Sequence, residues 1–286
     1  MTSNIMLIRK QSSSPFRTVT DKDETNRLTS ELGGGKGSYR VVKSVLKNPL
    51  MAPAIKAIGA INKFHDSLTS RWNDAGFFLI KAHNYERYTE GMDSLIGQAR
   101  DIIHDLSHNW DRVMEAEREF LGEKRKPFIA SDYPTAEGFR DSFSYTYAFQ
   151  SLPNMEGVEI NSFTLSALRE ALDRRNQEAL RQTTNELNAE MVQLLEHMVN
   201  TLADPDKIFR NSLVDNVRTL LEQREARDMC SDPVLKERFD SIASMIAGVS
   251  ADDLRNNKRL RSELAREAEE KVQAITRQSA GRAFLK

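Results

Sequence analysis

Two histidines, His104 and His108, have the spacing of a metal site on a helix. Because they are four residues apart, a helix would place both imidazoles on one face, as a zinc site requires. No third ligand can be assigned, and no glutamate lies between them in the His-Glu-x-x-His arrangement of zinc hydrolases. Polar side chains also flank many packed helix faces. The sequence therefore predicts no metal site.

The other motifs that carry chemistry are incomplete. A glycine-rich run, Gly33 to Ser38, contains glycines and a lysine that can cradle phosphate, but it lacks the spacing of a P-loop. We interpret it as a flexible linker. The single cysteine, Cys230, excludes an internal disulfide and a cysteine-based zinc site. With no Ser/His/Asp pattern and no dinucleotide fingerprint, we predict a protein that is not an enzyme and needs no cofactor.

Basic residues form two clusters. The first, Lys124, Arg125 and Lys126, lies close in sequence to Tyr133, and aromatic rings beside bases can stack on single-stranded nucleic acid. The second, from Arg255 to Arg266, is interleaved with acidic residues, as on a solvated helix face. The chain has 41 Lys and Arg against 42 Asp and Glu, so its net charge does not favour nucleic acid. Nucleic-acid binding by the first cluster is kept as an alternative.

The segment from Ser142 to Leu152 alternates aromatic and small residues. An extended backbone would place four rings, those of Phe143, Tyr145, Tyr147 and Phe149, on one face. These rings either pack on the ends of neighbouring helices or dock a protein partner or a second copy of the chain. We assign the four aromatic residues as candidate partner-binding residues.

The elements on either side of this segment are predicted to be helices. Apolar residues at helical spacing indicate one helix over residues 54–68, and residues 92–120 follow a heptad pattern typical of a coiled coil. A second long stripe covers residues 165–201, with a change of register that resembles a stutter. Three shorter apolar stripes follow it. The predicted seam of the first long helix consists of Met92, Leu95, Ala99, Ile102, Leu106, Asn109, Val113, Ala116 and Phe120.

These elements predict a mainly α fold. The two long helices would form an elongated antiparallel helical hairpin within a bundle, with a small β-containing insertion at its tip. We expect residues 1–50 to be weakly ordered, residues 51–286 to form the bundle, and residues 122–164 to form the insertion. No stretch approaches the roughly 20 apolar residues of a membrane span, so we expect a cytoplasmic protein that does not enter a membrane.

The region from Phe139 to Pro153, between long charged helices, resembles a family of uncharacterised proteins of bacteriophages and integrative elements. Members of that family are often encoded beside a MoxR- or CobS-like AAA+ ATPase. The resemblance implies a phage or mobile-element protein in a bacterial host cell, with an AAA+ ATPase as a partner. The family has no assigned catalytic residues, so none are implied here.

We therefore expect a non-enzymatic scaffold or adaptor that forms a homo-oligomer and docks a protein partner through its aromatic segment. One alternative is a nucleic-acid-binding accessory protein in phage replication or recombination. Another is a helical pore former with an aromatic tongue, although hydroxyl groups dilute the four rings of that tongue.

Overall fold

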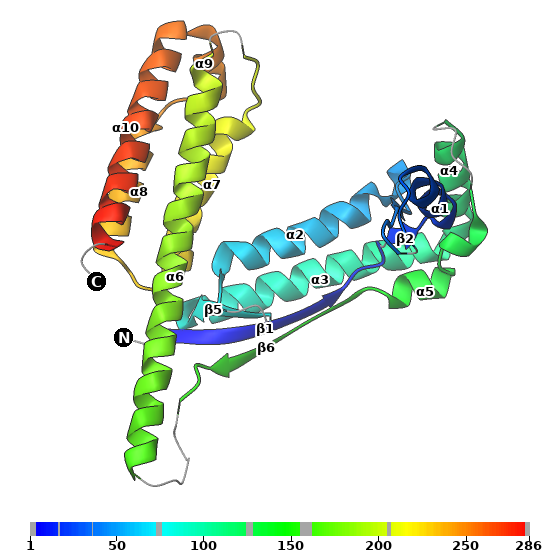
Figure 1. The fold of residues 1–286 in the computed structure, drawn as a ribbon, viewed down its shortest axis with the longest axis horizontal. Coiled ribbons are helices and arrows are strands. Elements are labelled where there is room, and N and C mark those ends of the chain that lie inside the picture. Colours follow the sequence, from blue (N-terminus) through cyan, green and yellow to red (C-terminus); the bar gives the residue numbers. More distant parts are fainter. Residues whose placement is uncertain are drawn as a thin grey trace. The chain divides into compact units, whose positions relative to one another are not determined.

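The computed structural model describes residues 4–16, 18–35, 37–72, 76–123, 128–154, 162–204 and 207–283. These residues are mainly helical, with ten α-helices and a four-stranded antiparallel sheet (Figure 1). The predicted class, mainly α, is confirmed. No helix of the described residues is long and apolar enough to cross a membrane.

The chain divides into two compact units that are interleaved in sequence. Unit 1 contains Met1–Arg9, Ser67–Tyr85 and Phe149–Lys286. Unit 2 contains Lys10–Asp66 and Glu86–Ala148. The predicted boundaries at residues 50, 122 and 164 stay a prediction.

Unit 1 is built around a long continuous helix, α6 (Ser162–Leu202). It is followed by α7 (Ser212–Arg227), α8 (Pro233–Met245), α9 (Ala251–Asn256) and α10 (Lys258–Ala283). The C-terminal half of α6 supplies the apolar side of a shared core, because its buried residues recur every three or four positions. The α6 residues in this core are Leu187, Met191, Leu195, Met198 and Leu202.

The charged C-terminal helix α10 packs on α6 within unit 1 (Figure 1). Leu264, Ala268 and Ile275 are its buried contacts. Ile208 lies before α7, which begins at Ser212, and it is 95% exposed.

Arg261 closes the C-terminal end of α6. It is only 6% exposed, and its guanidinium donates to the carbonyl oxygens of Thr201, Leu202 and Lys207 at 3.0, 3.1 and 3.0 Å. The last carbonyls of a helix have no partner inside the helix and carry partial negative charge, so a buried cation stabilises them. The sequence placed Arg261 in a solvated basic cluster. The buried side chain corrects that interpretation.

The sheet has the strand order β4 (Ser70–Arg71), β5 (Phe77–Lys81), β1 (Ile5–Ser13), β6 (Ser144–Ser151). β1 and β5 are antiparallel, with Leu7 opposite Leu79. Both of these leucines are buried in unit 1. Weak order was expected for residues 1–50, but β1 is an inner strand of this sheet. The sequence did not predict this strand, because its apolar run is short and its strand partner lies about seventy residues further along the chain.

Unit 2 contains most of α2 (Ala52–Leu68) and α3 (Tyr85–His108), together with α4 (Trp110–Glu123) and α5 (Ala136–Asp141). The predicted 92–120 seam is therefore two helices, which meet at a turn at Asn109. The buried line along α3 runs through Met92, Ile96, Ala99 and Ile103. Residues 92–120 and 165–202 fall in different units, so the antiparallel hairpin stays a prediction.

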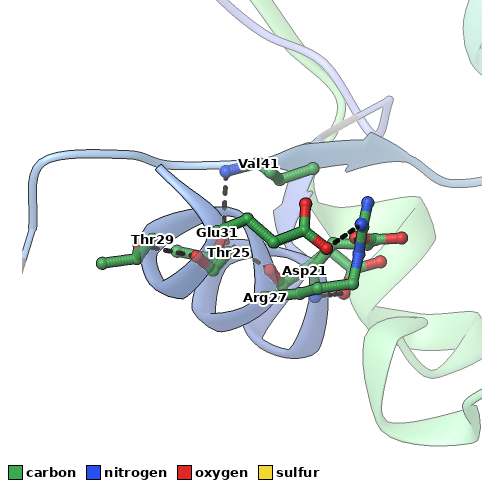
Figure 2. A network of polar contacts seen from close by, with 7 residues as sticks. Asp21, Thr25, Arg27, Thr29, Glu31 and Val41 are labelled. Carbon is green, nitrogen blue, oxygen red and sulfur yellow. Dashed lines mark hydrogen bonds and ion pairs between the residues drawn. The ribbon is translucent and has the colours of Figure 1, made fainter. Parts of the chain in front are cut away.

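The N-terminal part of unit 2 is held by polar contacts (Figure 2). The helix α1 (Lys22–Glu31) has no buried residue, and the Asp21 side chain caps it by accepting from the Glu24 amide at 3.2 Å. The Thr25 hydroxyl accepts from the Val41 amide at 3.0 Å, and it is 2.5 Å from the Asp21 carbonyl oxygen, to which it donates. These bonds tie α1 to the two-stranded sheet of β2 (Thr18–Thr20) and β3 (Val42–Ser44).

A buried carboxylate organises the turn that follows β3. Glu117 is 1% exposed, and its Oε2 accepts from the backbone amide and the side-chain amide of Asn48 at 3.0 and 2.7 Å. Its Oε1 accepts from the amide of Leu46 at 3.1 Å. Leu46 has a φ of 60°, a conformation that costs free energy for a residue with a side chain. The carboxylate therefore stabilises a strained turn by accepting hydrogen bonds from its amides. Three short 3₁₀-helices are also present among the described residues, Pro49–Met51, Ala82–Asn84 and Ala130–Asp132.

Candidate functional site

The aromatic segment forms the strand β6, extended as the sequence predicts. Its residues 144–148 belong to unit 2. Burial alternates along this part of the strand: Tyr145 is 8% exposed, whereas Ser144, Thr146 and Ala148 are exposed. The strand therefore has an aromatic face and a small polar face.

The two tyrosines of the aromatic face are fixed by side chains of α2 and α3. The Tyr145 hydroxyl donates to Asn62 Oδ1 at 3.0 Å, and the Tyr147 hydroxyl donates to Asp93 Oδ1 at 2.6 Å. The Tyr147 ring also meets the ring of Tyr88 edge to face, with 5.4 Å between centroids. Each ring is thus held by packing at its body and by a hydrogen bond at its tip.

The two phenylalanines of the segment also contact neighbours in their own units. Phe143 packs against the core of unit 2, which includes Ile103 and Phe139. Phe149 lies in unit 1, where its ring centroid is 4.6 Å from that of Tyr85. All four rings therefore contact other residues of this chain. The assignment of Phe143, Tyr145, Tyr147 and Phe149 as partner-binding residues stays a prediction.

A buried polar cluster lies behind the tyrosines. His65 is fully buried, and its Nδ1 is 2.7 Å from the Tyr88 hydroxyl. Burial, together with the positive charge of Lys10, lowers the pKa of His65 to about 3. Burial also raises the pKa of Tyr88 above its usual range. Both groups are therefore neutral at pH 7, and they can exchange a hydrogen bond without burying a charge.

Lys10 joins this cluster to the strand. Its Nζ donates to Asn62 Oδ1 at 3.3 Å and lies 5.7 Å from the centroid of the Tyr145 ring. Burial lowers the pKa of Lys10, and the negative charge of Asp66 opposes that effect. Asn62 thus accepts from both Lys10 and Tyr145. This convergence fixes the orientation of the strand's aromatic face.

The strand β6 lies at the edge of the four-stranded sheet. β6 is the last strand in the order β4-β5-β1-β6, so one side of its ladder has no strand partner among the described residues. Ser13 of β1 holds the start of the segment from the other side, with its hydroxyl donating to the Ser142 carbonyl oxygen at 2.7 Å. The edge is therefore anchored on one side and open on the other.

The remaining predicted residues lie elsewhere. The basic cluster Lys124, Arg125 and Lys126 lies outside the described residues. The rings of His104 and His108 are 4.2 Å apart, and His108 Nδ1 is 2.9 Å from the His104 carbonyl oxygen. Among the described residues, no group of three or more His, Cys, Asp or Glu side chains could hold a metal ion.

Sequence reasoning missed Asn62 and His65. They are three residues apart, on the face of α2 that also carries the buried Ile61. Polar residues within an apolar helical stripe indicate buried hydrogen bonds, and that signal was available in the sequence.

No family model, curated protein or solved structure matches this chain. The resemblance to phage and mobile-element proteins therefore stays an expectation.

Proposed function

We propose that this protein is a non-enzymatic scaffold that associates with a second copy of itself through the outer edge of β6. The observation that carries this proposal is the open edge over residues 144–148. Unpaired strand edges readily pair with other chains, and proteins usually protect them with lysine, proline, bulges or a covering element. The stretch Ser144–Ala148 contains no charged residue and no proline.

The strand is also preorganised for pairing. Its tyrosines are held by Asn62 and Asp93, so the backbone is already extended and little further ordering is needed on association. The exposed side chains Ser144, Thr146 and Ala148 are small, so a second strand can approach without a clash.

A second copy is the occupant that fits this edge best. Two identical edges pair in antiparallel fashion about a twofold axis, and each then satisfies the backbone groups of the other. This arrangement does not require the predicted elongated hairpin with the aromatic strand at its tip. Docking of an AAA+ ATPase remains an expectation that follows from the family resemblance alone.

The test is the mass of the full-length protein in solution. We expect sedimentation equilibrium to give a dimer at micromolar concentration. Replacing Thr146 and Ala148 with lysine should convert it to a monomer, because like charges would face each other across the new pair.

The matched control is Gln98→Lys combined with Ser94→Lys, which adds the same charge on exposed positions of α3. This control should remain a dimer. A monomeric wild type at about 100 μM, well above the Kd expected for a functional assembly, would refute the proposal. So would a lysine variant of β6 that keeps the wild-type mass.

The two alternative functions, a nucleic-acid-binding accessory and a pore former, remain predictions from sequence. No contact of the described residues favours either of them over the scaffold.

A further inference from the structure

Unit 1 contains a cleft of about 840 Å³ beside the middle of α6. The α6 residues that line it are spaced three or four apart, so they share one face of the helix. The opposite walls come from the end of β5, the start of β1 and the turn between α7 and α8. Its volume lies within the range of about 300 to 1,000 Å³ that is usual for small-molecule sites. The α6 face consists of Asp173, Asn176, Gln177, Leu180 and Arg181.

The carboxamide of Asn176 is the central polar group of this cleft. The residue is 6% exposed, and its Nδ2 donates to the Pro153 carbonyl oxygen at 3.2 Å. That bond fixes the orientation of the amide. Its Oδ1 is buried and accepts no hydrogen bond from any described residue. A buried acceptor without a donor is unfavourable, so a ligand that brings an N–H or O–H group to Oδ1 would be favoured.

Among the residues that line the cleft, cations outnumber anions, while the buried carboxylate of Asp228 lies near Lys81 outside the lining. Lys81 and Arg181 are positively charged, and Asp173 is the one carboxylate among the lining residues. Lys81 Nζ donates to the Glu225 carbonyl oxygen at 2.7 Å, which holds the ammonium in place and leaves two further N–H donors. Arg181 is exposed and forms no ion pair with a described residue. The cleft therefore favours a negatively charged group.

The cleft also has an apolar floor. Ile5 and Met229 are buried there, and Leu180 packs against the same cluster. The Cys230 thiol donates to the Leu180 carbonyl oxygen at 3.1 Å, so the turn is bound to α6 across the cleft. A ligand would thus meet carbon on one side and charged groups on the other.

We propose that this cleft binds a small hydroxylated organic anion. Its carboxylate or phosphate would pair with Arg181 and Lys81, and a hydroxyl would donate to Asn176 Oδ1. The proposal is independent of self-association through β6, because the cleft lies in unit 1 and residues 144–148 lie in unit 2.

Isothermal titration calorimetry on the full-length protein tests this with two matched pairs of probes. L-malate and succinate differ by one hydroxyl, as do 3-hydroxypropyl phosphate and propyl phosphate. The two pairs separate a carboxylate ligand from a phosphate ligand. In at least one pair, the hydroxylated anion should bind about tenfold more tightly than its match, the effect of one added hydrogen bond to a buried acceptor.

Variants then assign the contacts. Arg181→Gln should weaken binding about tenfold, whereas the control Arg174→Gln should leave it unchanged, since Arg174 is an exposed α6 residue outside the lining. Asn176→Leu should abolish the preference for the hydroxylated anion. If Asn176→Leu does not fold, Arg181→Gln and the wild-type comparison of matched probes decide the question. The proposal is overturned if none of the four probes binds at about 10 mM, or if Arg181→Gln does not weaken binding. Equal affinity within both pairs also overturns it.

Discussion

The buried His65 should make unit 2 sensitive to acid. In the folded protein its pKa is about 3, whereas an unfolded histidine titrates near 6.5. Between these two values the unfolded state binds the extra proton, so the free energy of unfolding falls as the pH falls. This contribution is fully present above about pH 6.5 and is lost as the pH approaches 3.

The size of the effect follows from the two pKa values. Between pH 7 and pH 5 the loss amounts to about 2 kcal/mol, and by pH 3 it reaches about 4 kcal/mol, since each pKa unit corresponds to about 1.4 kcal/mol. Complete burial of His65 justifies use of the shift without a discount for solvent screening. Carboxylates also titrate between pH 7 and pH 3. The contribution of His65 is therefore measured as the difference in free energy of unfolding between two variants that have the same carboxylates.

The measurement compares wild type with His65→Gln by urea unfolding at pH 7 and pH 5. The chain has two tryptophans, Trp72 in unit 1 and Trp110 in unit 2. Trp72→Phe in all proteins leaves Trp110 as the reporter of unit 2, where its ring centroid is 4.8 Å from that of Phe139. The stability advantage of the wild type over His65→Gln should shrink by about 2 kcal/mol between pH 7 and pH 5.

The control is His104→Gln, which removes an exposed histidine of the same unit. Its stability should follow the wild type at both pH values. The reasoning would be refuted if the stability difference between wild type and His65→Gln were the same at pH 7 and pH 5 within about 0.5 kcal/mol. If His65→Gln does not fold, NMR titration of the wild-type imidazole decides, and protonation of His65 above pH 5 would contradict the prediction.

Three further substitutions test single contacts, each measured by chemical unfolding at pH 7. Glu117→Gln should destabilise unit 2 by about 3 kcal/mol, because the charge that binds the amides of the Leu46 turn is lost, and an unchanged midpoint would contradict this role. Arg261→Lys should lower the free energy of unfolding of unit 1 by about 2 kcal/mol, because an ammonium cannot replace the guanidinium fork at the end of α6. The control Arg259→Lys, at an exposed position, should leave the stability unchanged, and equal effects of the two substitutions would count against the capping role. Tyr147→Phe should cost about 1 kcal/mol through the lost bond to Asp93, with helix content by circular dichroism unchanged.

Local patterns in the sequence were sufficient to predict α6 and β6, but not α1 or α5. The stripe along α6 and the alternation of Tyr145 and Tyr147 are both periodic, and periodicity depends only on near neighbours in the chain. The 92–120 seam was predicted as a single helix, because Asn109 fits a heptad position and nothing in its immediate neighbours marks a stop. Its side-chain amide bonds back to the Asp105 carbonyl oxygen at 2.9 Å, which competes with the helical pattern.

The rest depends on contacts between distant residues. β1 pairs with β5, although the whole of α2 lies between them in the sequence. Glu117 accepts a hydrogen bond from the amide of Leu46, 71 residues away. No window of sequence contains both partners of such a contact. The same holds for Asn176, which looks like an ordinary polar residue on a helix until Pro153 fixes its amide and the cleft surrounds it.

The two units are interleaved in sequence, so no single boundary in the chain separates them. The chain passes between units after Arg9, Asp66, Tyr85 and Ala148, and two of these crossings occur within the strands β1 and β6. A cut at any one of them would leave part of one unit on the wrong fragment, so neither unit can be isolated by simple truncation. Strands that contribute to both units also link their folding. The acid unfolding should therefore be repeated in a Trp110→Phe series, in which Trp72 reports on unit 1. Comparison with the Trp72→Phe series, in which Trp110 reports on unit 2, shows whether the two units unfold together.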